Sequence, residues 1–200
     1  MEVVYLESIP SGLQWEYQPL AWQVVDDGRG ITITAGGSTD LFNDPQGAIP
    51  IDNAPRLMFE PEGNFTLSAK VKVAFSSTFD AGVLLIYGNA DRWAKLCFEF
   101  SPHREPMVVS VVTHTLSDDC NSSIIEGEEI FLRLARIDQA FAFHFSRDGE
   151  FWHLVRLFSL GEGAFRIGFS AQSPTGETCA AIFREIEFTE RRLKDVRSGE

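Results

Sequence analysis

The chain has 200 residues, 44% of them hydrophobic, and no linker, composition shift or internal repeat divides it. This length and apolar content predict one domain over residues 1–200, with a short charged tail from about residue 190. The formal net charge of -12 excludes nucleic acid and anionic membrane surfaces as partners, because polyanions are bound by basic surfaces that release counterions.

Residue types and their spacing indicate an all-β protein. Phe occurs 17 times, against three Met and three Tyr, and rigid aromatic and branched side chains suit pleated, half-buried surfaces. Apolar residues alternate with a period of two between turn signals, and no long stretch keeps the 3.6 period of a helix. Strands are expected at residues 30–35, 65–75, 81–87, 93–100, 107–115, 130–137, 140–146, 152–158, 165–171 and 179–188. Such a series of short strands predicts a sandwich of two sheets.

The clearest local unit is a hairpin within "F-A-F-H-F-S-R-D-G-E-F-W-H-L". Phe141, Phe143 and Phe145 share one face of the first strand, Asp148-Gly149 forms the turn, and Trp152 begins the return strand. The positions expected to be buried in the core include Phe98, Leu134 and Phe143.

The three cysteines are Cys97, Cys120 and Cys179, and they cannot all pair with one another. No C-x-x-C spacing indicates a zinc site or a redox couple. We expect reduced, buried thiols, including Cys120. The acidic first residues are too poor in apolar side chains for a signal peptide, which predicts a cytoplasmic protein. No metal is expected, and the residues point to no particular cofactor.

Several segments, taken in order, resemble one known family, the regulation-of-enolase protein family. They are "G-S-T-D-L-F-N-D-P" (37–45), "F-D-A-G-V-L-L-I-Y" (79–87), "R-W-A-K-L-C-F-E" (92–99), "V-S-V-V-T-H-T-L-S-D-D-C-N" (109–121), "F-S-R-D-G-E-F-W" (145–152) and "A-Q-S-P-T-G" (171–176). The resemblance implies a concanavalin A-like two-sheet jelly-roll sandwich with one concave sheet, in the cytosol. One member of that family is named for an effect on the glycolytic enzyme enolase. A fold shared with lectins and glucanases does not by itself define a function.

The segment "D-R-W-A-K-L-C-F-E-F" predicts a strand with one polar face. Alternation places Trp93, Lys95, Cys97 and Glu99 on one side and the apolar residues on the other. A stacking tryptophan beside an ammonium and a carboxylate would suit a sugar ring with its hydroxyl rim. In that case loss of Trp93 would cost binding and little stability. The alternative is a solvated outer face, on which Lys95 and Glu99 pair and Trp93 covers a sheet edge.

The same test assigns further residues to this face. His144 alternates with phenylalanines and Arg133 with leucines, while Gln172 lies opposite Ile167 and Phe169. A concave sheet would therefore bring these three side chains into one groove with the strand around Lys95. His144 taken alone is a satisfied or surface histidine more often than a catalytic base. Strand order cannot be read from periodicity.

The stretch "T-L-S-D-D-C-N-S" follows a run of valines and offers Asp118, Asp119 and Asn121. Neighbouring residues of an extended chain point to opposite faces, so at most one of the two aspartates can face a groove. One interpretation is a polar turn that ends a buried strand, because Asp and Asn accept backbone N–H bonds there. The other is a ligand-binding loop at the rim of the groove.

Two further acidic segments have alternative interpretations. "T-D-L-F-N-D-P" offers Asp40, Asn43 and Asp44 as oxygen ligands for calcium, although an Asx turn that ends at Pro45 is favoured. "E-I-E-F-T-E" (185–190) resembles the catalytic strand of retaining glucanases, with Glu187 in place of the middle aspartate. An acidic edge strand is favoured there, with Ile182, Ile186 and Phe188 on its buried face.

These residues predict a lectin-like protein that binds a small carbohydrate, a sugar phosphate or a related metabolite in the concave groove. Lys95 and Arg133 would bind anionic or hydroxyl groups. Hydrogen bonds would come from Glu99, Gln172 and one of the aspartates at 118 and 119. One alternative is a regulatory protein that contacts a metabolic enzyme such as enolase, as the resemblance implies. Another is a carbohydrate-active enzyme that uses Glu99 and His144.

Overall fold

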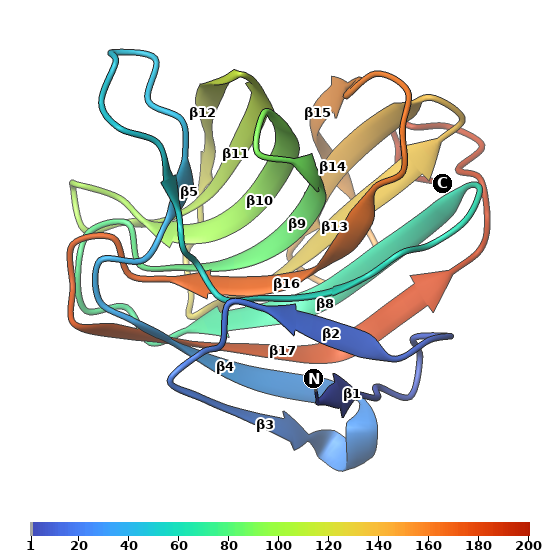
Figure 1. Ribbon diagram of the computed structural model, residues 1–200. Helices are drawn as coiled ribbons and strands as arrows, with labels where there is room; N and C mark the ends of the chain where they lie inside the picture. The colour runs from blue at the N-terminus through green and yellow to red at the C-terminus, as the bar shows by residue number, and fades with distance from the viewer. Residues whose placement is uncertain (1) are drawn as a thin grey trace.

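The computed structural model describes residues 2–200, so Met1 of the expected domain lies outside the described part. The chain forms two antiparallel sheets that pack face to face (Figure 1). The eight-stranded sheet has the order β1-β2-β7-β16-β9-β10-β11-β12. Its strands are β1 Val3–Val4, β2 Leu13–Glu16, β7 Arg56–Phe59, β9 Ala81–Asn89, β10 Arg92–Phe100, β11 Pro106–His114, β12 Leu116–Ile124 and β16 Arg166–Gln172.

The seven-stranded sheet has the order β15-β14-β13-β8-β17-β4-β3. Its strands are β3 Ala21–Val25, β4 Gly30–Gly36, β8 Phe65–Val73, β13 Glu129–Ile137, β14 Ala140–Ser146, β15 His153–Phe158 and β17 Thr178–Thr189. A separate pair consists of β5 Leu41–Phe42 and β6 Ile51–Asp52, and a short 3-10 helix covers Asp26–Gly28. The expected all-β two-sheet sandwich is confirmed. Between residues 2 and 200, no helix is long and apolar enough to cross a membrane.

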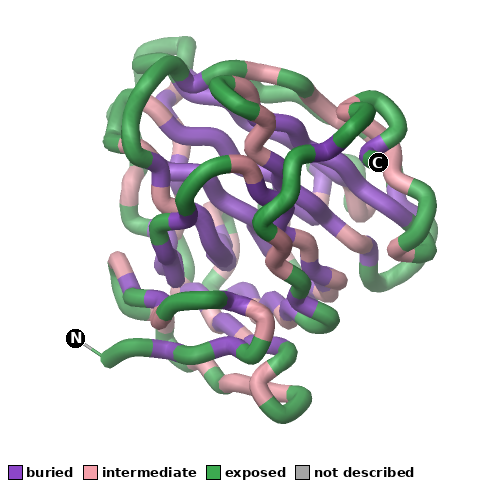
Figure 2. Tube along the Cα trace, turned by 90° about the vertical axis from the view of Figure 1, so that its right-hand side faces the viewer, coloured by how far each residue is buried: buried purple, intermediate pink, exposed green. Residues whose placement is uncertain are grey.

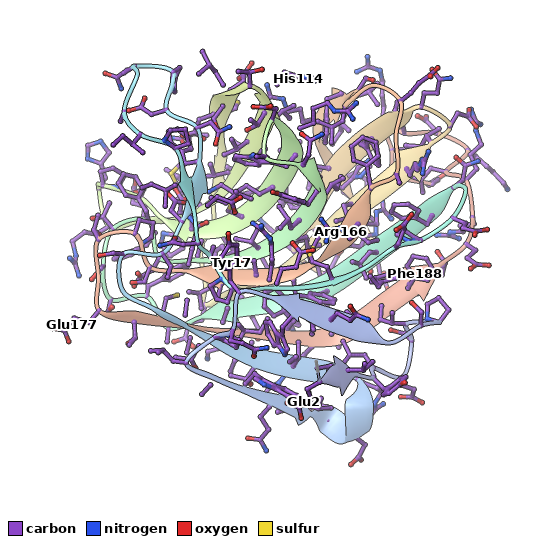
Figure 3. All side chains as sticks on the ribbon, viewed as in Figure 1. Glu2, Tyr17, His114, Arg166, Glu177 and Phe188 are labelled. Atoms are coloured by element: carbon purple, nitrogen blue, oxygen red, sulfur yellow. The ribbon has the colours of Figure 1, made fainter. Side chains whose placement is uncertain are left out.

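The main core lies between the two sheets, where side chains fill the space (Figure 3). Alternation directs one side of each strand inward, and the buried positions follow the strands while exposed positions gather in the loops (Figure 2). Phe98, Leu134 and Phe143 are buried in this core, as expected. The hairpin turn is also confirmed, because the Asp148 carboxylate accepts hydrogen bonds from the backbone of Glu150 and Phe151.

Every expected strand is present within two residues at either end, but the sequence did not indicate the short strands β1, β2, β3, β5, β6 and β7, or the nine-residue strand β12. The stretch that contains Asp118 and Asp119 is a strand of the sheet edge and not a turn. The turn before it needs only Thr115, which has a positive φ of 66° and lets His114 pair with Leu116. An edge strand exposes much of its surface, so its polar composition resembles that of a loop.

A β-bulge changes the faces of β17. Its register against β8 shifts between Arg184 and Glu187, and Glu185 has a φ of 48°. Phe183 and Ile186 are consequently buried, whereas Ile182 is only partly buried, which corrects the expected buried face. The strand also lies between β8 and β4, so the expectation of an acidic edge strand is wrong.

The expected free state of the cysteines is confirmed, and Cys97 and Cys179 are buried. Cys120 is exposed, so its expected burial is wrong. The reason is its position on β12, at the edge of the eight-stranded sheet.

Residues 37–55, called here the covering segment, lie over the outer face of the eight-stranded sheet and include β5 and β6 (Figure 1). Leu41 of this segment joins a second apolar cluster, whose members also include Met58, Trp93, Cys97, Val109 and Val111. Asn43 fastens the segment through side-chain hydrogen bonds to the carbonyls of Ala90 and Thr115. The Asx turn at Asp44 is confirmed, since its carboxylate accepts the N–H of Gln46 across Pro45. The covering segment therefore shields part of the outer face of the eight-stranded sheet from solvent.

Candidate functional site

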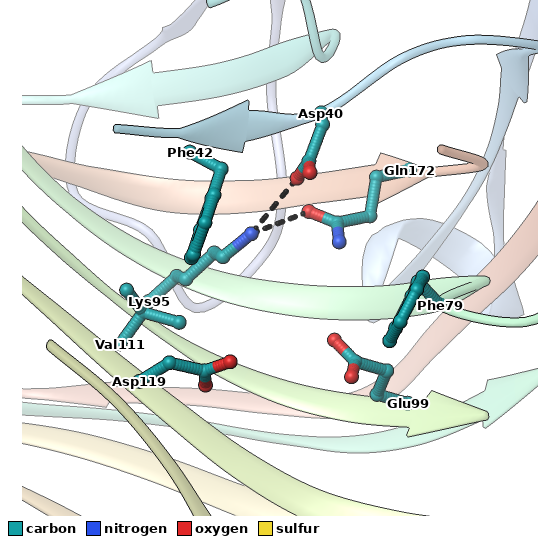
Figure 4. A pocket seen from close by; sticks show the side chains of 8 residues that line it. All are labelled: Asp40, Phe42, Phe79, Lys95, Glu99, Val111, Asp119 and Gln172. Carbon is teal, nitrogen blue, oxygen red and sulfur yellow. Dashed lines mark hydrogen bonds and ion pairs between the residues drawn. The ribbon is translucent and has the colours of Figure 1, made fainter. Parts of the chain in front are cut away.

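A pocket opens between the covering segment and the eight-stranded sheet (Figure 4). Its volume is about 160 Å³. Strands β10, β11, β12 and β16 supply its floor, while the covering segment and the loop before β9 supply its walls. The lining residues are Asp40, Phe42, Phe79, Lys95, Glu99, Val111, Asp119 and Gln172.

Strand pairing explains why these side chains meet. Lys95 on β10 pairs with Val111 on β11, which in turn pairs with Asp119 on β12. Paired residues of neighbouring strands point to the same face of a sheet, so the three side chains share the outer face. Glu99 lies four residues along β10, which returns it to that face, and Gln172 reaches the pocket from β16.

Lys95 is the buried cation of the pocket. Its Nζ donates to Asp40 Oδ1 and to Gln172 Oε1, each at 3.0 Å. Burial by itself would lower the pKa of Lys95, but the nearby charge of Asp40 raises it above its ordinary value. An ammonium has three N–H donors, and these two bonds leave the third available to a molecule in the pocket.

Two carboxyl groups face the lysine from the other side of the pocket (Figure 4). Burial raises the pKa of Glu99 to about 8, against the opposing effect of Lys95. Burial likewise raises the pKa of Asp119. At neutral pH, Glu99 is therefore mainly a neutral acid that can donate a hydrogen bond, and an oxygen of Asp119 can accept one.

Apolar surface completes the lining. The rings of Phe42 and Phe79 and the side chain of Val111 border the pocket. Phe79 is 38% exposed and has a positive φ of 69°. Its backbone N–H is held by the carbonyl of Phe100 at 2.7 Å. Such strained residues persist where the surrounding structure fixes them, often at ligand sites.

Of the residues expected to bind a ligand, the structure brings together Lys95, Glu99, Asp119 and Gln172. Asp118 does not face the pocket, because it pairs with Arg156 at 2.9 Å on the other side of β12. Asn121 lies farther along β12, exposed and outside the lining.

Trp93 is on the same face as Lys95, but it does not offer a stacking surface. It is 0% exposed and belongs to the apolar cluster that includes Leu41 of the covering segment. The expectation of a ligand platform at Trp93 is therefore wrong, as is the alternative of a solvated face. The physical reason is that residues distant in sequence fold over this end of the sheet.

Arg133 and His144 lie in the other sheet, on β13 and β14, so the expectation that they share the groove is wrong. The chain's last residues cover them: Arg133 donates to the carbonyl of Gly199 at 2.8 Å, and the His144 ring bonds the carbonyl of Val196 at 2.7 Å. Burial lowers the pKa of His144 to about 4, so this histidine is neutral at ordinary pH. The C-terminal tail is thus packed on the seven-stranded sheet.

The glucanase-like segment does not reach the pocket either. Glu185 lies on β17 of the seven-stranded sheet and pairs with Lys70 at 3.6 Å. Glu187 borders a different surface depression, beside Trp152. Neither can act on a ligand held beside Lys95.

Phe42, Phe79 and Val111 were not among the residues expected to bind a ligand, and Asp40 was expected only in a calcium site or a turn. A signal was present for all four residues, because the segments 37–45, 79–87 and 109–121 carried the family resemblance. Periodicity could not show that these segments meet over the sheet. Within residues 2–200, no three His, Cys, Asp or Glu side chains gather closely enough to hold a metal ion.

Comparison with known families identifies the relatives of this sequence. The family described as "Protein of unknown function (DUF1349)" matches residues 15–191. The chain belongs to this family. The match includes every strand of the two sheets except β1 and the start of β2, and the whole lining of the pocket in this DUF1349 protein. A search of the curated proteins finds no match.

Solved structures share the fold. A functionally unknown protein from Saccharomyces cerevisiae superposes with a TM-score of 0.81 and 21% identity, over 88% of this chain and 95% of that chain. The GH43 BlXynB protein from Bacillus licheniformis gives a TM-score of 0.66 at 15% identity, over 88% of this chain but 37% of that chain. An alginate lyase from Klebsiella pneumoniae gives 0.56 at 14%, over 84% and 83%. At these identities the likeness concerns the fold alone.

The raised pKa of Glu99 predicts how stability depends on pH. Below the ordinary value of 4.5 both folded and unfolded chains hold the proton, but between 4.5 and about 8 only the folded chain holds it. Glu99 therefore makes the folded state less stable as the pH rises through this window. We expect the urea midpoint to fall less between pH 5 and pH 8 in Glu99→Gln than in the wild type. The matched control is Glu126→Gln, since Glu126 is exposed. Urea midpoints that fall equally with pH in the wild type and in Glu99→Gln would contradict a raised pKa of Glu99 in the folded state.

Proposed function

We propose that this DUF1349 protein binds a small polyhydroxylated molecule, a carbohydrate or a related metabolite, in the pocket beneath the covering segment. One observation carries the proposal: a pocket whose hydrogen-bonding side chains, such as Lys95, Glu99 and Asp119, stand beside the rings of Phe42 and Phe79. A sugar ring has an apolar face and a rim of hydroxyl groups, and this lining offers a partner to each.

The size of the pocket supports a ligand of about one ring. Its volume of about 160 Å³ is close to that of an engineered apolar cavity of roughly 150 Å³ that binds benzene. The pocket is also partly open to solvent, so a substituent or a further sugar unit can extend outward. We therefore propose a single sugar unit as the bound part of the ligand.

The charges in the pocket oppose a phosphorylated ligand. The positive charge of Lys95 is already balanced by Asp40 at 3.0 Å. Asp119 and Glu99 face the same space, so a phosphate group would meet carboxyl groups and no free cation. Within the classes expected from the sequence, this favours an unphosphorylated carbohydrate over a sugar phosphate.

The shared fold adds limited support. The comparisons place the same sandwich in an alginate lyase and in part of a GH43 protein, but at identities that carry no activity to this chain. An enzymatic alternative would need Glu99 and Asp119, since His144 lies in the other sheet. Product formation from a bound saccharide would separate that alternative from binding alone.

The regulatory alternative stays a prediction from the resemblance to the regulation-of-enolase family. A cytoplasmic location belongs to the same prediction. Immobilised protein incubated with purified enolase tests it directly. Retention of enolase that survives saturation of the pocket with sugar would favour a separate contact surface.

The binding proposal is tested by thermal denaturation with a panel of monosaccharides, followed by calorimetric titration with those that raise the melting temperature. A ligand that binds only the folded state raises that temperature by mass action. We expect Phe79→Ala to weaken binding about 3- to 10-fold, the effect of losing one aromatic contact. The control is Phe151→Ala, which removes a ring that is 67% exposed and does not line the pocket. Absence of any stabilisation across the panel, or equal affinity in both variants, would contradict the proposal.

A further inference from the structure

We infer that the ligand of this pocket carries a protonated amine, which makes an amino sugar, or a closely similar aminated polyol, its chemical class. This inference rests on the proposed function and names the ligand class for the same site. It follows from the balance of charges around the cavity, from the two carboxyl groups in its lining and from the aromatic walls.

The charges that line the pocket do not balance. Lys95 and Asp40 form an ion pair, and the amide of Gln172 is neutral. Asp119 and Glu99 are left over, and among the described residues neither takes part in an ion pair with a Lys or Arg side chain. The charge of Arg156 lowers the pKa of Asp119, but Arg156 forms its ion pair with Asp118 on the other face of β12. The cavity therefore has an excess of acidic groups and lacks a cation to match them.

This imbalance is unfavourable in the empty pocket. A carboxylate that loses water is destabilised, and this loss raises the pKa of Glu99 and of the more exposed Asp119 despite the opposing charge of Lys95. An ammonium group on the ligand would provide the missing positive charge and donate charge-assisted hydrogen bonds to these oxygens. A neutral sugar would leave the imbalance in place, and an anionic one would increase it.

The arrangement fits an organic cation better than a metal ion. The carboxyl groups lie on the wall of the cavity, and no group of three potential ligands within residues 2–200 is close enough for a metal. Phe42 and Phe79 add apolar walls, which can contact carbon atoms and attract a nearby ammonium through their ring faces. The remaining N–H of Lys95 is available to a hydroxyl oxygen of the same ligand.

Matched sugars test the inference with the wild-type protein. The probes are glucosamine with glucose, galactosamine with galactose, and mannosamine with mannose, together with the N-acetyl form of each amine. Titration calorimetry at neutral pH should show at least one amine binding about 10-fold or more tightly than its hydroxyl counterpart, the effect of a hydrogen bond to a charged group. The N-acetyl form should lose this advantage, because the acetyl group removes the charge while keeping the nitrogen.

Proton release provides a second readout. Binding of a cation favours the ionised form of Glu99, so the protein should release protons when the amine binds. The apparent binding enthalpy should then differ between two buffers of different ionisation enthalpy, after correction for the proton balance of the free amine. The Glu99→Gln variant should lose this buffer dependence, and Asp119→Asn should lose most of the preference for the amine. Glu126→Gln, which changes an exposed carboxylate, should keep both.

The outcomes separate the inference from the proposed function. Neutral sugars that bind as tightly as their amines would overturn the inference and leave the carbohydrate function in place. Failure of every sugar, neutral or aminated, to bind the wild type would overturn both. A tighter amine whose preference survives in Glu99→Gln and in Asp119→Asn would also overturn the inference, because the advantage would not come from these carboxyl groups.

Discussion

Replacement of Trp93 by alanine is expected to destabilise the protein by about 3–5 kcal/mol, the range for loss of a large aromatic side chain from a core. Trp93 is 0% exposed and packs within the apolar cluster beneath the covering segment. Its removal would leave a cavity between β10 and residues 37–55, and well-packed surroundings close such a cavity only in part. Urea denaturation of wild type and variant, monitored by circular dichroism, measures the difference.

A matched control distinguishes burial from the loss of an aromatic ring as such. Phe151 is 67% exposed, and Phe151→Ala should change stability by no more than about 0.5 kcal/mol, as surface substitutions usually do. A Trp93→Ala protein as stable as the wild type would show that the covering segment does not pack on the sheet, and would restore the stacking role predicted from alternation. Trp93→Phe should recover part of the lost stability, since it refills part of the cavity.

Replacement of Lys95 by methionine is expected to cost about 3–5 kcal/mol, because it leaves Asp40 without its buried partner. Methionine keeps much of the volume and the unbranched shape of lysine, so packing changes little and the charge is the main variable. The ion pair also joins β10 to the covering segment, so amide hydrogens around residue 41 should exchange faster in the variant.

A double-mutant cycle isolates the contribution of this pair. Asp40→Asn removes the carboxylate, and the combined variant carries no unpaired charge at either position. We expect the combined variant to be more stable than Lys95→Met alone, because a missing pair costs less than a single buried charge. Destabilisations that simply add across the cycle would show that Lys95 and Asp40 do not interact in solution.

Local sequence patterns predicted the fold class and most of the residues on the outward face of β10. Phe141, Phe143 and Phe145 alternate with other residues, and this period of two indicates a β-strand. The same alternation correctly separated Lys95 and Glu99 from the inward-facing Phe98. It succeeds because neighbouring side chains of a strand must point to opposite faces, whatever the rest of the chain does.

Local patterns failed where a residue's position depended on distant segments. His144 and Arg133 alternate with core residues just as Lys95 does, but their strands belong to the other sheet. Strand order is decided by which strands pair across long stretches of chain, and periodicity carries no information on that choice. β12 was missed for a related reason, since an edge strand has fewer buried positions to create a pattern.

The sequence by itself determined that the chain forms a two-sheet sandwich, which residues of each strand share a face, and that Lys95 and Glu99 lie opposite the main core. Only the tertiary structure decided what covers that second face. Residues 37–55 fold over one end of it, bury Trp93 and bring Asp40 to Lys95. The physical reason is that alternation records the direction of a side chain relative to its own strand. Burial and charge pairing depend on the segment that packs against it, which here comes from a distant part of the chain, since Asp40 lies 55 residues before Lys95.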